Sequence, residues 1–173
     1  MTAGLKPSRL WLYGLLVRLM PETRFFGLKR FVLRWCGVAI GRDVRICSSA
    51  QFAGNGHIVI GDDVWIGAMD YLAATGANVI TIDSHCDLGP GVMILTGSHE
   101  ITPAGDHIGG NGSGADVHIG AGCWLGARST VLAGVELAPK TLVAAGAVVI
   151  ESCEERCVLL TGVPASKKRS LSQ

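Results

Sequence analysis

The chain has 173 residues, enough for one domain, with 24 glycines, 49% hydrophobic residues, few aromatic residues and only 17% charged residues. This composition excludes intrinsic disorder, and because basic and aromatic residues are not interleaved, a nucleic-acid-binding protein is not expected. The net charge is +1, but residues 1–45 hold nine Lys and Arg against two acidic residues, which favours contact between this basic head and an anionic surface or substrate.

Residues 8–36 predict one or two helices on either side of Pro21. One apolar face comprises Leu12, Leu15, Leu16 and Leu19, and a second comprises Phe25, Leu28, Phe31, Val32 and Trp35. We interpret residues 1–36 as a helical cap that covers one end of the following domain. A basic amphipathic helix can also attach to a membrane surface, and the two roles are compatible.

The apolar run at residues 10–20 is too short to span a bilayer and is not followed by a signal-peptide cleavage site. We therefore expect a cytoplasmic protein, which could contact the inner face of the membrane through the predicted helices.

A six-residue period is the strongest feature of the remaining chain. The apolar positions in this frame are Ile40, Ile46, Phe52, Ile60, Ile66, Leu72, Ile82, Leu88, Ile94, Ile119, Leu125, Val131, Leu137, Val143 and Val149. A helix would scatter these residues around its surface, whereas three short extended segments joined by tight corners place them in one interior column. The period predicts an all-β fold of about five triangular coils over residues 37–165, followed by a tail at residues 166–173.

The longest interruption of the period, residues 100–116, predicts an extruded loop. His99 precedes this loop at an outward phase, and Trp124 has the same phase in the rung that follows it. We therefore expect His99, the loop and Trp124 to form one site.

The segment Leu95-Thr96-Gly97-Ser98-His99-Glu100 is similar to the catalytic histidine region of the maltose, galactoside and nodulation-factor acetyltransferases, and more closely to that of colanic-acid-type polysaccharide acetyltransferases. Trp124-Leu125-Gly126 matches the Trp-Ile-Gly rung of the same group. With the six-residue repeat, these motifs resemble the left-handed parallel β-helix of the hexapeptide-repeat acyltransferases over roughly residues 37–169. The resemblance implies a homotrimer with sites between neighbouring helices, acetyl-CoA as co-substrate, and a sugar or glycan hydroxyl as acceptor in cell-surface polysaccharide biosynthesis.

His99 is the predicted general base, because a neutral imidazole can take the proton of a weakly nucleophilic hydroxyl at neutral pH. Glu100 either assists His99 or is a solvated loop acid. By resemblance, the N–H of Ala127 would stabilise the tetrahedral oxyanion.

The predicted acetyl-CoA site consists of Trp124, Ala127, Ala145, Gly146 and Arg169, again by resemblance. Trp124 would pack on the co-substrate or line the acceptor pocket, with a trimer contact as its alternative role. The Thr-Lys pair that the family carries after the last rung is replaced here by Ile150-Glu151, which puts one phosphate contact in doubt.

Three residues are predicted to bind the acceptor. His107 lies in the loop that should approach the site. Asp70 and Asn78 flank the slip in the period after Leu72, where related enzymes place a polar residue that binds the acceptor.

Other functions remain alternatives. A γ-class carbonic anhydrase would need two histidines separated by four residues, and the five histidines contain no such pair; the six cysteines also form no zinc motif, so no metal is expected. A streptogramin-type antibiotic acetyltransferase shares the fold and the histidine. A non-catalytic β-helix scaffold would leave the outward His99 without a role.

Overall fold

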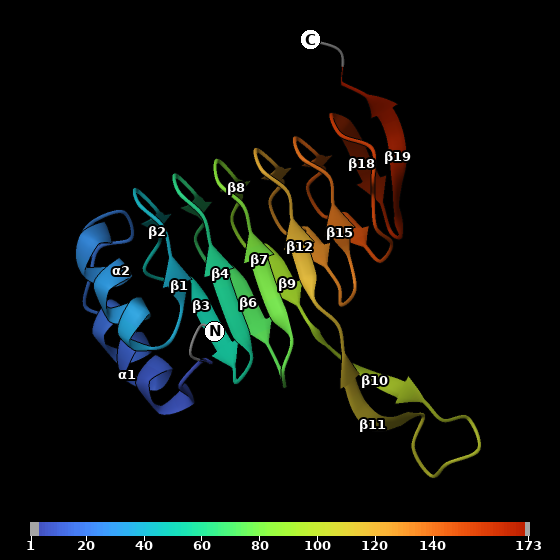
Figure 1. Ribbon diagram of the computed structural model, residues 1–173, viewed down its shortest axis with the longest axis horizontal. Helices are drawn as coiled ribbons and strands as arrows, with labels where there is room; N and C mark the ends of the chain where they lie inside the picture. The colour runs from blue at the N-terminus through green and yellow to red at the C-terminus, as the bar shows by residue number, and fades with distance from the viewer. Residues whose placement is uncertain (1–3, 172–173) are drawn as a thin grey trace.

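The computed structural model describes residues 4–171 as a triangular parallel β-solenoid with helices at one end and a strand hairpin at the other (Figure 1). Residues 1–3 of the predicted cap and 172–173 of the predicted tail lie outside the described residues. Helices α1 (Pro7–Val17) and α2 (Phe26–Trp35) precede the first strand. The predicted all-β helix with a short helical cap is confirmed.

Three sheets form the sides of the prism, and the chain visits them in the order I, II, III in each coil. Sheet I contains β1 (Ala39–Ile40), β4 (His57–Ile60), β7 (Val79–Ile82), β12 (Val117–Ile119) and β15 (Glu136–Leu137). Sheet II contains β2 (Arg45–Ile46), β5 (Trp65–Ile66), β8 (Asp87–Leu88), β13 (Trp124–Leu125), β16 (Leu142–Val143), β18 (Val158–Gly162) and β19 (Ala165–Ser170). Sheet III contains β3 (Gln51–Gly54), β6 (Tyr71–Ala74), β9 (Met93–Leu95), β14 (Thr130–Val131) and β17 (Val148–Val149).

Five complete coils are followed by an incomplete sixth turn. Cys153 bridges to Leu137 on sheet I, and β18 then adds to sheet II. The predicted number of about five coils is therefore slightly low. β19, which covers most of the predicted tail, turns back and pairs antiparallel with β18.

The six-residue frame fills the interior, as predicted. On sheet I, Ile40, Ile60, Ile82, Ile119 and Leu137 stack in register and are all buried. Each coil alone cannot cover this apolar column, so stacking of successive coils stabilises the fold. The corners turn sharply, and residues with positive φ recur at equivalent places of corner II–III, including Met69, Gly91, Arg128 and Gly146.

The helices cap the first coil with residues other than those predicted. α1 buries Leu10, Tyr13 and Val17, and α2 buries Lys29 and Leu33. The predicted apolar faces point outward: all four leucines of the first face are exposed, as are Phe25, Leu28, Phe31 and Trp35 of the second. The correction has a different reason in each helix. α1 carries two apolar stripes and only one can face the coil, whereas α2 turns Leu33 and its basic side chains toward the coil.

Basic side chains of α2 saturate the open edge of the first coil. In a parallel sheet, the carbonyl groups that point away from the second coil have no strand to pair with. Lys29 Nζ donates to the Ile46 carbonyl oxygen at 2.9 Å, and Arg30 Nη1 and Arg34 Nη2 each donate at 2.8 Å to the carbonyl oxygens of Val44 and Ile40. Part of the basic head therefore completes the hydrogen bonding of the fold.

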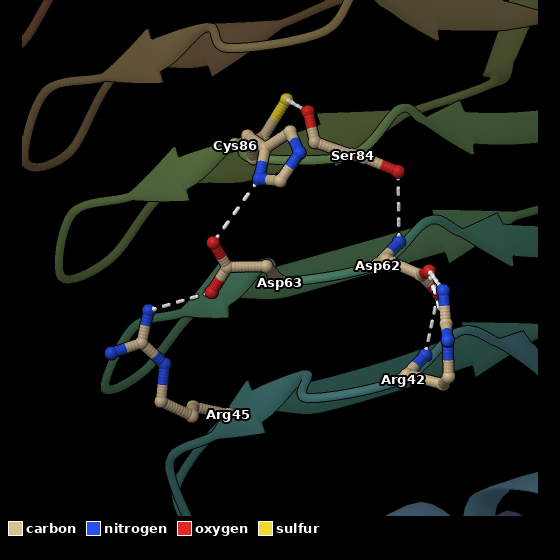
Figure 2. A network of polar contacts seen from close by, with 7 residues as sticks. Arg42, Arg45, Asp62, Asp63, Ser84 and Cys86 are labelled. Atoms are coloured by element: carbon tan, nitrogen blue, oxygen red, sulfur yellow. Dashed lines mark hydrogen bonds and ion pairs between the residues drawn. The ribbon is translucent and has the colours of Figure 1, made fainter.

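Corner I–II carries a ladder of exposed polar contacts across the first three coils. Figure 2 shows Arg42 paired with Asp62 at 2.8 Å and Arg45 paired with Asp63 at 3.3 Å. The Asp62 N–H donates to Ser84 Oγ on the third coil. Exposed ion pairs contribute little to stability, so we assign this ladder a minor structural role.

The predicted loop is a β-hairpin. It leaves corner III–I between the third and fourth coils and projects from the prism (Figure 1). Its strands are β10 (Gly97–Ile101) and β11 (Gly109–Gly114), with a register shift between His99 and Ile101. The extruded segment therefore begins at Gly97 rather than at residue 100, and His99 lies on the hairpin itself.

Candidate active site

A cavity of about 520 Å³ lies where the hairpin leaves the solenoid. Its lining residues are Thr75, Gly76, Asn78, Gly97, Ser98, His99, Gly112 and Ser113. The structure thus brings together two of the predicted site residues, His99 and Asn78, which are 21 positions apart in the chain. The exposed His99 side chain agrees with the phase predicted for it.

The His99 ring is oriented by the opposite strand of the hairpin. Its Nδ1 lies 3.0 Å from the carbonyl oxygen of Gly110. A carbonyl oxygen can only accept a hydrogen bond, so Nδ1 carries the proton and Nε2 of the neutral ring keeps its lone pair. The arrangement leaves Nε2 able to take a proton from a bound molecule.

Glu100 has a different partner. Its Oε2 lies 3.5 Å from Asn111 Nδ2, across the hairpin, and the residue is exposed. The carboxylate therefore does not orient the His99 ring; the Gly110 carbonyl does. A catalytic role of Glu100 stays a prediction.

The base of the hairpin is held against the solenoid by polar contacts. Thr96 is fully buried; its hydroxyl oxygen accepts the N–H of Thr75 at 2.9 Å, and its carbonyl oxygen accepts the N–H of Ala115 at 3.0 Å. Any side chain at Gly114 would collide with the Thr96 carbonyl oxygen and with the Asn78 amide. Asn78 Nδ2 donates to the Thr75 carbonyl oxygen at 2.9 Å, so this side chain is fixed at the cavity wall.

Asp70 does not share this cavity. Its side chain is fully buried beneath corner II–III, where Oδ2 accepts the N–H of Gly67 at 2.6 Å and Oδ1 accepts the N–H of Val92 at 2.9 Å. Burial raises the pKa of Asp70 to about 7, and the backbone hydrogen bonds oppose this shift. The position predicted to bind the acceptor therefore serves to tie two coils together, because both oxygens are already used.

His107 is exposed in the turn of the hairpin and is not among the residues that line the cavity. Its contact with the acceptor stays a prediction.

Corner II–III presents bare backbone in the fourth and fifth coils. Ala127 and Ala145 occupy equivalent places, and the Gly146 N–H donates to the Ala127 carbonyl oxygen at 2.9 Å. Within residues 4–171, the N–H groups of Ala127 and Ala145 have no hydrogen-bond acceptor. Two unpaired donors in one column suit a developing oxyanion or the amide carbonyls of a ligand such as coenzyme A.

Trp124 and Arg169 lie on one outward column of sheet II. The strand register runs from Trp124 through Leu142 and Leu159 to Arg169. Trp124 is 56% exposed, and Arg169 is exposed as well. Three strand spacings separate the two residues, roughly 14 Å. An exposed aromatic ring and a cation at this spacing fit an elongated ligand with an anionic end.

The two groups of predicted residues lie on opposite sides of one protomer. His99 and Asn78 are at corner III–I, and in a triangular prism this corner is opposite sheet II, which carries Trp124. Ala127 lies at corner II–III, at the far edge of sheet III. His99 and Trp124 therefore do not lie side by side within one protomer, since the repeat phase shows only that a residue points outward, and a site that contains both stays a prediction.

Sequence reasoning missed two contributors to the site, one that orients His99 and one that lines the cavity. The Gly110 carbonyl is a backbone group whose position depends on the hairpin register, so no side-chain pattern could have indicated it. Thr75 lies 24 residues before His99 and reaches the cavity only through coil stacking. Among residues 4–171, no group of three or more His, Cys, Asp or Glu side chains is arranged to hold a metal ion.

Comparison with known proteins identifies relatives over most of the chain. The model for the hexapeptide repeat of succinyl-transferase matches residues 116–151. WcaF of Escherichia coli, named as a colanic acid biosynthesis acetyltransferase, is 31% identical over 137 residues, which are 79% of this chain and 71% of WcaF.

Solved structures share the fold. A hexapeptide-repeat acetyltransferase of Vibrio cholerae in complex with acetyl coenzyme A has a TM-score of 0.77 at 22% identity, covering 96% of this chain and 87% of that chain. A maltose O-acetyltransferase of Clostridium difficile has a TM-score of 0.72 at 18% identity, covering 96% of this chain and 86% of that chain. At these identities, the structural likeness concerns the fold alone.

Proposed function

The chain belongs to the hexapeptide-repeat acetyltransferase family, and we propose that it is an acetyl-CoA-dependent O-acetyltransferase that acts on a sugar or glycan hydroxyl. The observation that carries this proposal is His99, exposed at a cavity and oriented by a carbonyl oxygen so that Nε2 is left to act as a base. The similarity to WcaF supports an acceptor in cell-surface polysaccharide biosynthesis.

In the proposed reaction, His99 Nε2 takes the proton of the acceptor hydroxyl as its oxygen attacks the thioester carbonyl. Such base catalysis contributes about 10²–10⁴-fold. The bound donor supplies an electrophilic thioester carbonyl and a thiolate leaving group. The N–H of Ala127, which has no acceptor among residues 4–171, stabilises the negative charge on the carbonyl oxygen, and His99 then returns the proton to the departing sulfur.

We propose that the two halves of this site meet in a homotrimer with sheet III facing the three-fold axis. The outward residues of sheet III carry no charge; they are Gln51, Ala53, Tyr71, Ala73, Met93, Leu95, Thr130 and Val148. The outward column of sheet II, by contrast, includes Arg45 and Asp87, and that of sheet I includes Glu136. Charged residues are depleted from the centres of stable interfaces, which favours sheet III.

This arrangement completes the site because sheet III lies between the corner that carries His99 and the corner that carries Ala127. We call the residues at each of these two corners a half-site. Around a three-fold axis, corner III–I of one subunit abuts corner II–III of the next. His99 and Asn78 of one subunit would then face Ala127, Ala145 and Trp124 of its neighbour. Arg169 would bind the phosphates at the far end of the same groove.

We propose a cytoplasmic location with peripheral contact at the inner face of the membrane. All six cysteines are free thiols, as expected in a reducing compartment. Within residues 4–171, no helix combines the length and hydropathy that crossing a bilayer requires.

Release of free thiol from acetyl-CoA tests the proposal, with simple glycosides, nucleotide sugars and lipid-linked sugars as acceptors. His99→Ala should lower kcat by about 10²–10⁴-fold on the best acceptor while the protein stays folded. Glu100→Gln and His107→Ala, on the same hairpin, serve as matched controls. An unchanged rate for His99→Ala would refute the assigned base, and turnover with a streptogramin but with no sugar would indicate an antibiotic acceptor. Absence of turnover with every acceptor would favour a scaffold.

A further inference from the structure

Exposed large apolar side chains are concentrated on the outer face of the helical cap. Nine of the sixteen large apolar side chains that are exposed among residues 4–171 lie between positions 11 and 35. They are Trp11, Leu12, Leu15, Leu16, Leu19, Phe25, Leu28, Phe31 and Trp35. Monomeric proteins rarely expose a contiguous apolar patch of this kind without a binding partner.

The fold does not need these side chains. α1 already covers the first coil with Leu10, Tyr13 and Val17, and its exposed leucines form a separate stripe at helical spacing. The outward side chains of Leu19 and Phe31 are 89% and 69% exposed. A helix with apolar residues on both faces is stable in water only where something covers the second face.

The two helices present this face as one unit. The Arg9 guanidinium lies 4.4 Å from the centre of the Trp35 ring, and Arg9 Nη1 donates to the Trp35 carbonyl oxygen at 2.8 Å. These contacts join the start of α1 to the end of α2. The two helices lie together at the same end of the solenoid, so their exposed apolar residues are held on one side of the molecule (Figure 1).

The charge around the face is positive. Lys6, Arg18 and Arg24 are exposed, and Glu22 is the only acidic residue before Asp43. The Glu22 carboxylate accepts the N–H of Ser49 at 3.2 Å, so it is directed toward the first coil. A second copy of the cap would bring positive charge against positive charge, which disfavours self-association.

We propose that the outer face of the cap docks on an anionic lipid bilayer. Helices of eleven and ten residues are too short to span a bilayer, but they can lie in its interface with leucine and phenylalanine side chains among the acyl chains. Trp11 and Trp35 are of the residue type that prefers this boundary, and the flanking basic residues attract anionic headgroups. The inference does not depend on acetyl transfer.

Flotation of the full-length protein with vesicles measures the docking directly. Vesicles of phosphatidylglycerol and phosphatidylethanolamine should bind the protein at low salt, and purely phosphatidylcholine vesicles should bind it much less. The double variant Arg18→Gln/Arg24→Gln should weaken binding to the anionic vesicles by about 25-fold, since each basic side chain near the surface contributes about fivefold. Added salt should also weaken binding of the wild-type protein to the anionic vesicles.

A second double variant tests the apolar contribution. Leu19→Ser/Phe31→Ser should reduce vesicle binding by at least about tenfold, and because both side chains are exposed the fold should persist. Val163→Ser, at a 72% exposed apolar residue in the hairpin at the other end of the solenoid, is the matched control and should bind like the wild type.

Three results would overturn the proposal: no binding to anionic vesicles at low salt, equal binding to neutral vesicles, or unchanged binding by both double variants. A fall in the size of the assembly in solution on Leu19→Ser/Phe31→Ser would also overturn it, because the face would then be covered by another copy. Thiol release with a soluble glycoside should be unchanged in these variants, so failure of docking and failure of acetyl transfer give different results.

Discussion

Corners III–I and II–III border the same sheet but present different chemistry. At corner III–I the coil opens into the hairpin, and His99, Asn78 and Thr75 surround a cavity. At corner II–III the fourth and fifth coils turn tightly, and Ala127 and Ala145 present backbone N–H groups without acceptors among residues 4–171. In the proposed reaction, the first corner would supply the base and the second would supply hydrogen-bond donors for the negative charge. A rigid solenoid can thus divide a reaction between two edges, provided that a neighbouring copy brings the edges together.

Mixing two inactive variants is the strongest test of this division. His99→Ala alters one half-site, and Ala145→Trp fills the other, since Ala145 is exposed at corner II–III. Each variant alone should lose activity by about 10²-fold or more. Trimers formed from an equal mixture should recover roughly a quarter of the wild-type rate, because each mixed cyclic trimer contains one site with both halves intact. Thiol release after co-expression measures the recovery; if both halves belong to one subunit, no activity returns.

A charge on sheet III should dissociate the proposed trimer, so that the two corners of neighbouring subunits no longer meet. Ala73→Arg places a cation on the uncharged, half-buried face proposed to surround the three-fold axis. Burial of an unpaired charge should weaken association by about 100-fold or more, with a parallel loss of activity. Sedimentation analysis reports the assembly. Val59→Arg, at the equivalent half-buried position of sheet I, is the control; a trimer that survives Ala73→Arg and dissociates with Val59→Arg would assign the interface to sheet I.

Loss of the Trp124 ring should affect donor binding alone. Trp124→Ala is expected to raise KM for acetyl-CoA by about 10–30-fold with little change in kcat, as for removal of an aromatic side chain that contributes mainly to binding. Steady-state kinetics with the donor varied checks this expectation. If Trp124 instead forms only a subunit contact, the variant will weaken the assembly. At protein concentrations high enough to assemble the trimer fully, its KM for acetyl-CoA will then equal that of the wild type.

Asp70 provides a smaller, pH-dependent test of corner II–III. Burial raises the pKa of Asp70 to about 7 from its usual value of 3.8, so between about pH 4 and pH 7 the folded state binds more protons than the unfolded state. The stability of the wild type relative to Asp70→Asn should therefore fall as pH rises through this range and level off above pH 7. Urea unfolding at several pH values measures the difference. A difference that is constant, or that grows with pH, would show that the backbone hydrogen bonds to Asp70 outweigh its burial.

Much of the fold follows from local pattern. The six-residue frame predicts the buried column from Ile40 to Val149 and the outward direction of His99 and Trp124, because the alternation of an extended chain fixes which face a side chain takes. The helices on either side of Pro21 and the extruded segment before residue 116 follow from the same reasoning. The six-residue period does not assign each rung to a corner of the prism. It therefore could not predict that His99 and Trp124 are separated within one protomer.

The amino-acid sequence by itself determined the coil, the cap and the residue types available for acetyl transfer, since these depend on the spacing of apolar, small and polar residues along the chain. Only the tertiary structure decided that the Gly110 carbonyl orients His99 and that both carboxylate oxygens of Asp70 accept backbone N–H groups between coils. It also decided that Lys29 completes the hydrogen bonding at the edge of the first coil, and that the predicted apolar faces of the cap point outward. These outcomes depend on which backbone groups lie within hydrogen-bonding distance after the coils have stacked, and on which face of each helix packs against the core.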